Sequence, residues 1–246
     1  MSVLGIIPAR YSSSRFPGKP LVMINGTSML ERVYQQAKKS STLSEIIVAT
    51  DDQRIADHAS TFGAKAIITK ADHPSGTDRC WEAYVLNNKK FDYVLNIQGD
   101  EPLLDPEQIN SLILACDGKV EIATQMIKCT RQEDLFDTGE VKIVLNNKNE
   151  ALYFSRNVIP HLKGKNEKDW HKEHNYFRHV GMYAYRIDIL EKISALAPSA
   201  LEKAESLEQL RWLENGYKIT CIETTYDSHC VDTPEDLEKV LKMLNK

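Results

Sequence analysis

The stretch I-I-P-A-R-Y-S-S-S-R-F-P-G-K-P-L at residues 6–21 decides the fold predicted for this chain. An apolar run over residues 3–7 predicts a buried first strand, and the loop that follows carries Arg10, Arg15 and Lys19. Cations at the carboxyl end of a strand in an α/β protein form a site for an anionic ligand. Prolines stiffen this loop and hold its cations in place. Several cations held close together predict a strongly anionic ligand, and a nucleoside triphosphate meets that requirement.

The same loop lacks the glycine-rich motifs that usually bind phosphates. A P-loop has the pattern G-x-x-x-x-G-K-[ST], whereas here Ser13 stands in the place of the first Gly and Pro20 follows Lys19. The dinucleotide fingerprint G-x-G-x-x-G is absent from the chain, which disfavours a nicotinamide oxidoreductase. We therefore expect side-chain cations, and no backbone cradle, to hold the phosphates.

Composition narrows the class of protein further. The 246 residues include 31 Lys and Arg against 35 Asp and Glu, a net charge of −4, which argues against a nucleic-acid binder. No signal peptide or membrane-spanning run is apparent, so we expect no membrane anchor. The five cysteines are odd in number and contain no C-x-x-C pair, which predicts a reduced, cytoplasmic protein.

The first half of the chain alternates predicted strands and helices. Strands are expected at 3–7, 45–50, 65–69 and 93–97, with helices at about 28–39, 53–62, 76–88 and 106–116. This alternation predicts right-handed βαβ units and a mostly parallel sheet. Ligands of such sheets bind at the carboxyl ends of the strands, where Arg10, Asp51 and Asp100 are expected.

The second half has longer polar connections. We expect strands at 122–128, 141–145, 151–154, 180–185 and 218–223, and helices at 187–196, 206–215 and from Thr233-Pro234 onward. The polar segment 163–175 is expected to be the most mobile loop, and its His171-x-x-His174 pair to be solvated. The predicted organisation is a nucleotide-binding core of about 1–120 and 218–246, with an inserted sub-domain of about 121–217.

Two carboxylates are candidates for a metal site. Asp100 follows a predicted strand in N-I-Q-G-D-E-P at 96–102, a position suited to a hard cation such as Mg²⁺ that also binds phosphate oxygens. The alternative is that Asp100 only caps the turn before Pro102. Asp232 precedes a helix start in D-T-P-E-D, which by itself is a common way to open a helix.

A third motif is H-P-S-G-T-D-R at residues 73–79. Ser75 and Gly76 form a small polar turn at a predicted helix start, which allows a flat base to approach the backbone closely. Arg79 lies one helical turn further along. The alternative interpretation of this segment is plain helix capping by Ser75 or Thr77.

These motifs together closely resemble those of the sugar nucleotidyltransferases, and specifically the CMP-Kdo synthetases (3-deoxy-manno-octulosonate cytidylyltransferases). The resemblance covers nearly the whole chain. Besides the segments at 6–21 and 73–79, it includes Y-F-S-R at 153–156, R-H-V-G-M-Y-A-Y at 178–185 and L-E-Q-L-R at 207–211. It implies a Rossmann-like α/β nucleotidyltransferase fold with a mostly parallel central sheet and a partly β sub-domain for sugar binding and dimerisation.

The resemblance also implies a reaction, in which CTP and the acidic eight-carbon sugar Kdo give CMP-Kdo and pyrophosphate in a homodimer. Catalysis is expected from Arg10, Lys19, Asp100 and Asp232, with the two aspartates holding Mg²⁺. The expected nucleotide contacts are Pro8, Ala9, Arg10, Arg15, Lys19, Ser75, Gly76, Arg79, Gln98 and Asp100. The expected sugar contacts are Gln98, Arg156, His179, Tyr183, Tyr185, Glu208 and Gln209.

Three alternatives remain open at this point. CMP-sialate synthetases share the basic loop, but they typically have Asn after the Lys, where this chain has Pro20. A synthetase for 8-amino-Kdo would carry nearly the same motifs. A catalytically inactive nucleotide-binding regulatory protein is disfavoured because Lys19, Asp100 and Asp232 are all present.

Without the resemblance, Tyr183 and Tyr185 fit the rim of a core equally well, since alternation places both on one face.

Overall fold

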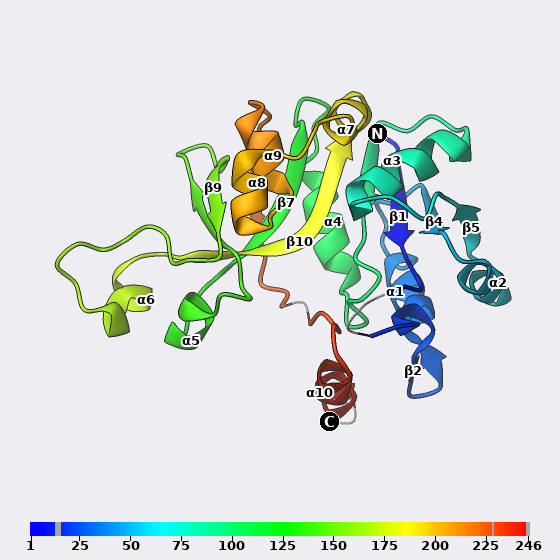
Figure 1. The fold of residues 1–246 in the computed structure, drawn as a ribbon, viewed down its shortest axis with the longest axis horizontal. Helices are drawn as coiled ribbons and strands as arrows, with labels where there is room; N and C mark the ends of the chain where they lie inside the picture. Colours follow the sequence, from blue (N-terminus) through cyan, green and yellow to red (C-terminus); the bar gives the residue numbers. More distant parts are fainter. Residues whose placement is uncertain (13–15, 228, 245–246) are drawn as a thin grey trace. The chain divides into compact units, whose positions relative to one another are not determined.

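A computed structural model describes residues 1–12, 16–227 and 229–244 of the chain (Figure 1). The chain divides into two compact units. The first unit combines Met1–Leu114 with the C-terminal residues from 228 onward, and the second is Ala115–Asp227. The first unit is therefore discontinuous in sequence, with the second unit inserted between its parts.

A parallel sheet forms the centre of the first unit. Strand β1 (Val3–Pro8) lies between β6 (Tyr93–Asn96) and β4 (Glu45–Thr50), and β5 (Lys65–Ile68) pairs with the far side of β4. All three pairings are parallel, as the βαβ pattern predicted. The apolar residues of β1 have no solvent exposure, because a strand in the middle of a parallel sheet is covered on both faces.

The helices of this unit begin where the sequence places capping residues. The side chain of Ser28 accepts the Glu31 N–H at the start of α1 (Met29–Ala37), and Ser75 accepts the Asp78 N–H at the start of α3 (Gly76–Asn87). The other elements are α2 (Gln53–Thr61), α4 (Pro106–Leu114), α10 (Pro234–Leu244), the short helix η1 (Lys19–Leu21), and the hairpin of β2 (Met23–Ile24) and β3 (Thr27–Ser28). Each cap satisfies a backbone N–H that the helix leaves without a partner.

The loop after β6 lies against the end of β1, and Gly99 makes this possible. A Cβ on Gly99 would lie 2.8 Å from the carbonyl oxygen of Pro8, closer than a side-chain carbon tolerates. Only a glycine therefore allows the loop to approach the strand this closely. The consequence is that Gln98 and Asp100 lie beside Ala9, at the carboxyl ends of two neighbouring strands.

The second unit is built on an antiparallel pair of long strands. Strand β10 (Phe177–Arg186) pairs with β7 (Ile122–Lys128), and β7 pairs in parallel with β11 (Ile219–Glu223). Two further strands, β8 (Lys142–Leu145) and β9 (Ala151–Ser155), extend from β10. We expected the strand at 218–223 in the nucleotide-binding core. Its pairing with β7 places it in the second unit, so the chain returns to the first unit only after Asp227.

The helices of the second unit differ from expectation around residue 206. The helix expected at 206–215 is the shorter α9 (Gln209–Glu214). It is preceded by α8 (Ala200–Glu205), which was not expected and which ends where Ser206 adopts a left-handed conformation with φ of 54°. The remaining elements of this unit are α5 (Gln132–Phe136), η2 (Glu167–Asp169), α6 (Trp170–Glu173) and α7 (Ile187–Ser194).

The segment expected to be a mobile polar loop contains a buried anchor. Trp170 is only 3% exposed and packs in a cluster with Cys129, Leu135 and Tyr176. Its indole N–H also donates to the carbonyl of Lys165, at 3.2 Å. The charged residues around Trp170 hid this anchor in the sequence.

Over the described part of the chain, no helix combines the length and the apolar character needed to cross a bilayer.

The close approach of Gly99 to Pro8 generates the first prediction. We expect Gly99→Ala to lower the free energy of unfolding by about 1–3 kcal/mol, because the new methyl group must push the two backbones apart. The measurement is urea unfolding followed by circular dichroism. Gly76→Ala is the control, since its Cβ would meet nothing closer than 3.5 Å. Equal stability of the two variants would contradict the steric explanation.

Candidate active site

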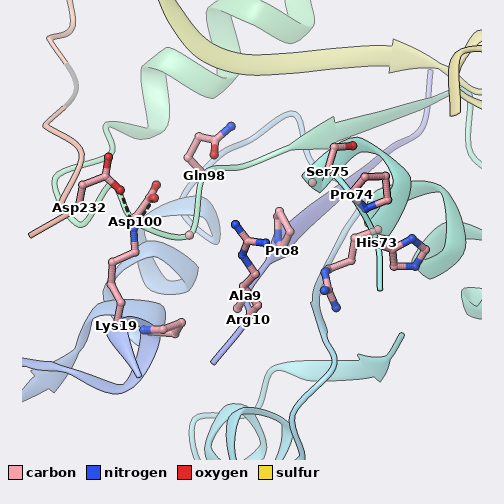
Figure 2. Close-up of a pocket in the computed structure, with 14 residues that line it drawn as sticks. Pro8, Ala9, Arg10, Lys19, His73, Pro74, Ser75, Gln98, Asp100 and Asp232 are labelled. Atoms are coloured by element: carbon pink, nitrogen blue, oxygen red, sulfur yellow. Dashed lines mark hydrogen bonds and ion pairs between the residues drawn. The ribbon is translucent and has the colours of Figure 1, made fainter. Parts of the chain in front are cut away.

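A pocket of about 300 Å³ opens at the carboxyl ends of β1 and β6, within the first unit (Figure 2). Its walls come from the loop after β1, from η1, from the start of α3 and the residues before it, from the loop after β6, and from the segment before α10. The lining residues are Pro8, Ala9, Arg10, Lys19, Pro20, His73, Pro74, Ser75, Gly76, Arg79, Gln98, Gly99, Asp100 and Asp232. The structure thus brings together every expected nucleotide contact except Arg15, which lies outside the described residues.

The charged centre of this pocket is Lys19, between two aspartates. The Lys19 Nζ lies 2.7 Å from Asp100 Oδ2 and 3.1 Å from Asp232 Oδ1 (Figure 2). Burial alone would lower the pKa of Lys19, but the ion pairs with Asp100 and Asp232 outweigh it and raise the pKa above its ordinary value. The ammonium group is therefore charged throughout the physiological pH range.

Asp232 reaches this centre from a distant part of the sequence. The Val231 N–H donates to the carbonyl of Asp100 at 2.9 Å, which joins the C-terminal segment to the loop after β6. The Val231 side chain is fully buried in a cluster with Ile24, Met29 and Val240. Apolar packing of Val231 and α10 thus fixes the adjacent Asp232 beside Asp100.

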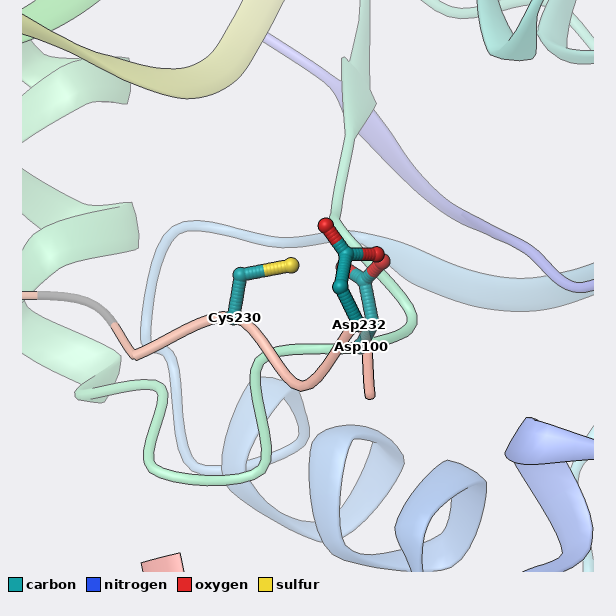
Figure 3. A group of neighbouring side chains, drawn as sticks. All are labelled: Asp100, Cys230 and Asp232. Carbon is teal, nitrogen blue, oxygen red and sulfur yellow. The ribbon is translucent and has the colours of Figure 1, made fainter. Parts of the chain in front are cut away.

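A third side chain with metal-ligand chemistry lies next to the two aspartates. Potential ligand atoms of Asp100, Cys230 and Asp232 all lie within 4.8 Å of one another (Figure 3). The two carboxylates fit a hard divalent cation, and their shared contact with Lys19 shows that a positive charge is stable between them. A thiol is a poor ligand for Mg²⁺, so Cys230 is a neighbour of this site and not part of the expected ligand pair. The sequence analysis missed Cys230, and its position two residues before Asp232 was the available signal.

The opposite side of the pocket is built around Arg79. Its guanidinium is almost fully buried, donates to Thr69 Oγ1 at 2.6 Å and forms an ion pair with Asp51 at 3.3 Å. Ser75 caps α3 and also donates to the Asp78 carboxylate at 2.6 Å. Helix capping by Ser75 and contact of this segment with a base are therefore compatible, because the cap fixes the turn that faces the pocket.

His73 is a pocket residue that the sequence analysis did not select, although it lies in the same motif. Its Nε2 lies 2.5 Å from Glu82 Oε2, and that carboxylate also accepts the Lys70 N–H. The contact with His73 and the Lys70 N–H lower the pKa of Glu82, against the opposing effect of burial. This contact fixes the ring orientation of His73 at the pocket wall.

The basic loop is held in place at its first residues. Arg10 is exposed at the pocket, while the next residue, Tyr11, carries the guanidinium of Arg54 over its ring at 3.4 Å. The Tyr11 carbonyl accepts the Gly18 N–H at 2.9 Å, which closes the loop. Gly18 adopts φ of 72° before η1, a conformation that favours glycine. These contacts place Lys19 where it meets the two aspartates.

The expected sugar contacts after residue 150 all belong to the second unit. Arg156 Nε donates to the carbonyl of Glu205 at 2.9 Å, and its Nη1 donates to the carbonyl of Thr138 at 3.2 Å. The Ser155 hydroxyl and the Arg156 N–H both donate to the Glu205 carboxylate, at 2.7 and 3.0 Å. Glu205 is a supporting residue that the sequence analysis missed, since only the fold brings α8 next to β9.

His179 and the tyrosines of β10 lie in an aromatic cluster. Burial lowers the pKa of His179 to about 3, so the imidazole is neutral, and its Nε2 is paired with Thr124 Oγ1 at 2.9 Å. Tyr183 stacks on Tyr185 with ring centroids 5.8 Å apart, and both rings meet the edge of Trp212. Tyr183 is 6% exposed, whereas Tyr185 is fully buried.

The last two expected sugar contacts lie at the start of α9. Glu208 occupies the N-cap position of this helix, and Gln209 is its first residue. Gln209 is 6% exposed, and Glu208 is half-buried. The neighbouring Arg211 is buried and forms an ion pair with Glu202 of α8. This ion pair fixes α9 against α8, although the two helices are separated by the left-handed Ser206.

Known proteins resemble this chain along nearly its whole length. A family model described as cytidylyltransferase matches residues 4–219. The 3-deoxy-manno-octulosonate cytidylyltransferase of Cytophaga hutchinsonii is 52% identical over 241 residues, which covers 98% of this chain and 96% of that protein. The mitochondrial 3-deoxy-manno-octulosonate cytidylyltransferase of Arabidopsis thaliana is 43% identical and covers 99% of this chain and 83% of that protein.

A solved structure agrees over the same length. The structure of CMP:2-keto-3-deoxy-manno-octonic acid synthetase complexed with CTP superposes with a TM-score of 0.91 and 40% sequence identity, covering 100% of this chain and 99% of that one. Identity this high along nearly the whole sequence defines a family, beyond a shared fold. The chain therefore belongs to the CMP-Kdo synthetase (3-deoxy-manno-octulosonate cytidylyltransferase) family.

Proposed function

We propose that this protein is a 3-deoxy-manno-octulosonate cytidylyltransferase, which converts CTP and Kdo into CMP-Kdo and pyrophosphate for lipopolysaccharide biosynthesis. The observation that carries this proposal is the position of Lys19 between Asp100 and Asp232, at the edge of a pocket that also contains Arg10. This arrangement suits a triphosphate and a cation together. The names of full-length relatives such as that of Cytophaga hutchinsonii support the same substrates.

The proposed reaction needs no covalent intermediate with the enzyme. The anomeric hydroxyl of Kdo attacks the α-phosphorus of CTP in line, and pyrophosphate leaves. Catalysis then consists of positioning and of charge stabilisation. Arg10, Arg15 and Lys19 bind the triphosphate, and Lys19 is the best candidate to stabilise the charge that develops in the transition state. Ser75, Gly76 and Arg79 form the base side of the pocket, with Pro8, Ala9 and Gln98 between the two sides.

Asp100 and Asp232 would hold Mg²⁺, which prefers carboxylate and phosphate oxygens. When bound, the ion supplies positive charge that reduces repulsion between the incoming hydroxyl and the phosphate oxygens. Lys19 balances the charge of the two carboxylates before substrates bind. The proximity of the two carboxylates is thus maintained by a residue of the chain itself.

The sugar half of the reaction is assigned to the second unit. Arg156 binds the Kdo carboxylate through a guanidinium, whose geometry matches a carboxylate. Neutral His179, Tyr183 and Gln209 bind hydroxyl groups of the sugar, and the Glu208 carboxylate accepts from another. Tyr185 supports the ring of Tyr183 from within the core. Such groups suit this task, because a sugar hydroxyl both donates and accepts hydrogen bonds.

We further propose a homodimer formed through the second unit, and a cytoplasmic location. Exposed apolar side chains of that unit, including Phe136, Leu152 and Leu201, are available to a partner. All five cysteines of the chain are free thiols, which suits a reducing compartment. Activation of 8-amino-Kdo or of sialate is the alternative within the same chemistry. An inactive regulatory protein would not be expected to retain Lys19 with both aspartates.

The proposed metal site predicts an unequal effect of Asp100→Asn. We expect turnover to fall by at least about 100-fold, because the amide cannot replace the charge of a metal-binding carboxylate, while CTP affinity changes far less. The measurements are pyrophosphate release at saturating Mg²⁺ and calorimetric titration of CTP. Asp105→Asn is the control, since it lies in the same loop and its side chain caps the Glu107 N–H. Near-normal turnover of Asp100→Asn would refute the metal assignment.

The substrate assignment predicts the outcome of a side-by-side assay. With Mg²⁺ present, we expect pyrophosphate release from CTP with Kdo, and little from UTP, ATP or GTP. Kdo, 8-amino-Kdo and N-acetylneuraminate are to be compared at equal concentration. If the enzyme prefers 8-amino-Kdo or N-acetylneuraminate, the assignment of the nucleotide and metal sites would stand, but the assignment of Kdo as the sugar would be wrong. If folded protein releases no pyrophosphate with any of the three sugars, the result would favour a binding protein over an enzyme.

A further inference from the structure

Lys142 has no role in the function proposed above, yet it is a fully buried lysine on β8. Its Nζ donates to the carbonyl oxygens of Asp137 at 2.7 Å and Glu140 at 2.5 Å. Burial lowers the pKa of Lys142, because the charged form loses its hydration. A buried ammonium that bonds to backbone carbonyls is costly, and an apolar residue would fill the same space at lower cost.

The two carbonyls belong to one tight turn at residues 137–140. Within the turn, the Glu140 N–H donates to the Asp137 carbonyl at 3.2 Å, and the Gly139 N–H donates to the Asp137 carboxylate at 2.7 Å. The side chains of this turn are largely exposed, so packing alone does not fix it. The hydrogen bonds of the Lys142 ammonium therefore attach this solvent-exposed turn to strand β8.

The turn at residues 137–140 also orients Arg156. The carbonyl of Thr138, inside the turn, accepts a hydrogen bond from Arg156 Nη1 at 3.2 Å, and the carbonyl of Glu205 accepts one from Arg156 Nε at 2.9 Å. Among the described residues, nothing bonds to Arg156 Nη2. Two backbone carbonyls thus set the plane of the guanidinium and leave one edge of it for a ligand.

A second arginine is attached to the same turn. Arg178 forms an ion pair with the Glu140 carboxylate at 3.3 Å and another with Asp227. The charges of Glu140 and Asp227 raise the pKa of Arg178, against the opposing effect of its burial. Lys142, Arg156 and Arg178 therefore share one turn as their acceptor, so displacement of the turn would move both guanidinium groups.

We propose that Lys142 is a positioning residue for the acidic-sugar site, which acts by holding the turn at 137–140 so that Arg156 is presented to the sugar carboxylate. This inference rests on the proposed function of Arg156. It gives a role to a buried lysine that the proposed phosphate chemistry does not use. It also explains why a turn with exposed side chains is fixed by so many hydrogen bonds.

The test is Lys142→Met, which keeps most of the apolar length of the side chain and removes the ammonium. We expect the KM for Kdo to rise about tenfold, because the carboxylate contact contributes to binding in both ground and transition states. The KM for CTP and the turnover at saturating Kdo are expected to stay within about twofold. A merely structural defect would lower the fraction of active enzyme and leave both KM values unchanged.

A second variant keeps the test decisive if Lys142→Met does not fold. Asp137→Ala removes the hydrogen bond to Gly139 from an exposed position, and we expect the KM for Kdo to rise about threefold, with the KM for CTP unchanged. Asp117→Ala is its matched control, because Asp117 closes an equivalent turn through the N–H groups of Lys119 and Val120. We expect wild-type kinetics for this control.

The possible results separate this inference from the proposed function. A wild-type enzyme that releases no pyrophosphate with Kdo would refute the proposed function before any variant is measured. A wild-type enzyme active with Kdo, combined with a normal KM for Kdo in the folded Lys142→Met or Asp137→Ala variant, would overturn the role of Lys142 alone. An equal rise of the KM for CTP and for Kdo would overturn it as well.

Discussion

The ion pairs of Lys19 with Asp100 and Asp232 are the interaction on which the nucleotide site depends. Asp100 lies in the loop after β6, Asp232 precedes α10, and Lys19 begins η1, so one ammonium joins three distant segments of the chain. Without a cation between them, two carboxylates this close would repel each other. The lysine thus stabilises the very arrangement that a metal ion and a triphosphate would need.

Backbone contacts, together with the apolar packing of Val231, bring these charges together. The absence of a Cβ at Gly99 allows the loop after β6 to approach Pro8, and the Val231 N–H joins the C-terminal segment to Asp100. Both contacts lie within one or two residues of an expected metal ligand. Because each depends on backbone position, the site is fixed before any ligand contributes binding energy.

The two units use different chemistry for their proposed ligands. The first unit offers fixed cations and carboxylates, which suit phosphates and a divalent cation. The second offers a neutral histidine, tyrosines and amides, with Arg156 as the cation for a carboxylate. Burial keeps His179 neutral, and backbone carbonyls orient Arg156 without neutralising it. Each unit therefore matches the charge of one substrate of the proposed reaction.

The sequence by itself determined the parallel sheet of the first unit, most helix starts and the family, because apolar periodicity, capping residues and motif order are local properties. It did not determine which unit contains β11, the presence of α8 before α9, or the burial of Trp170. These depend on pairing partners and on packing between segments that lie far apart in the chain.

The same distinction holds for the sites. The residues of the basic loop and the aspartates were identifiable from local motifs. Only the tertiary structure decided that Lys19 lies between Asp100 and Asp232, that Cys230 adjoins them and that Tyr185 is fully buried. The link from Lys142 through its turn to Arg156 was likewise invisible in the sequence. The reason is physical: a motif specifies which group is present, whereas distance and burial, which set its charge and its partners, arise only when the chain is folded.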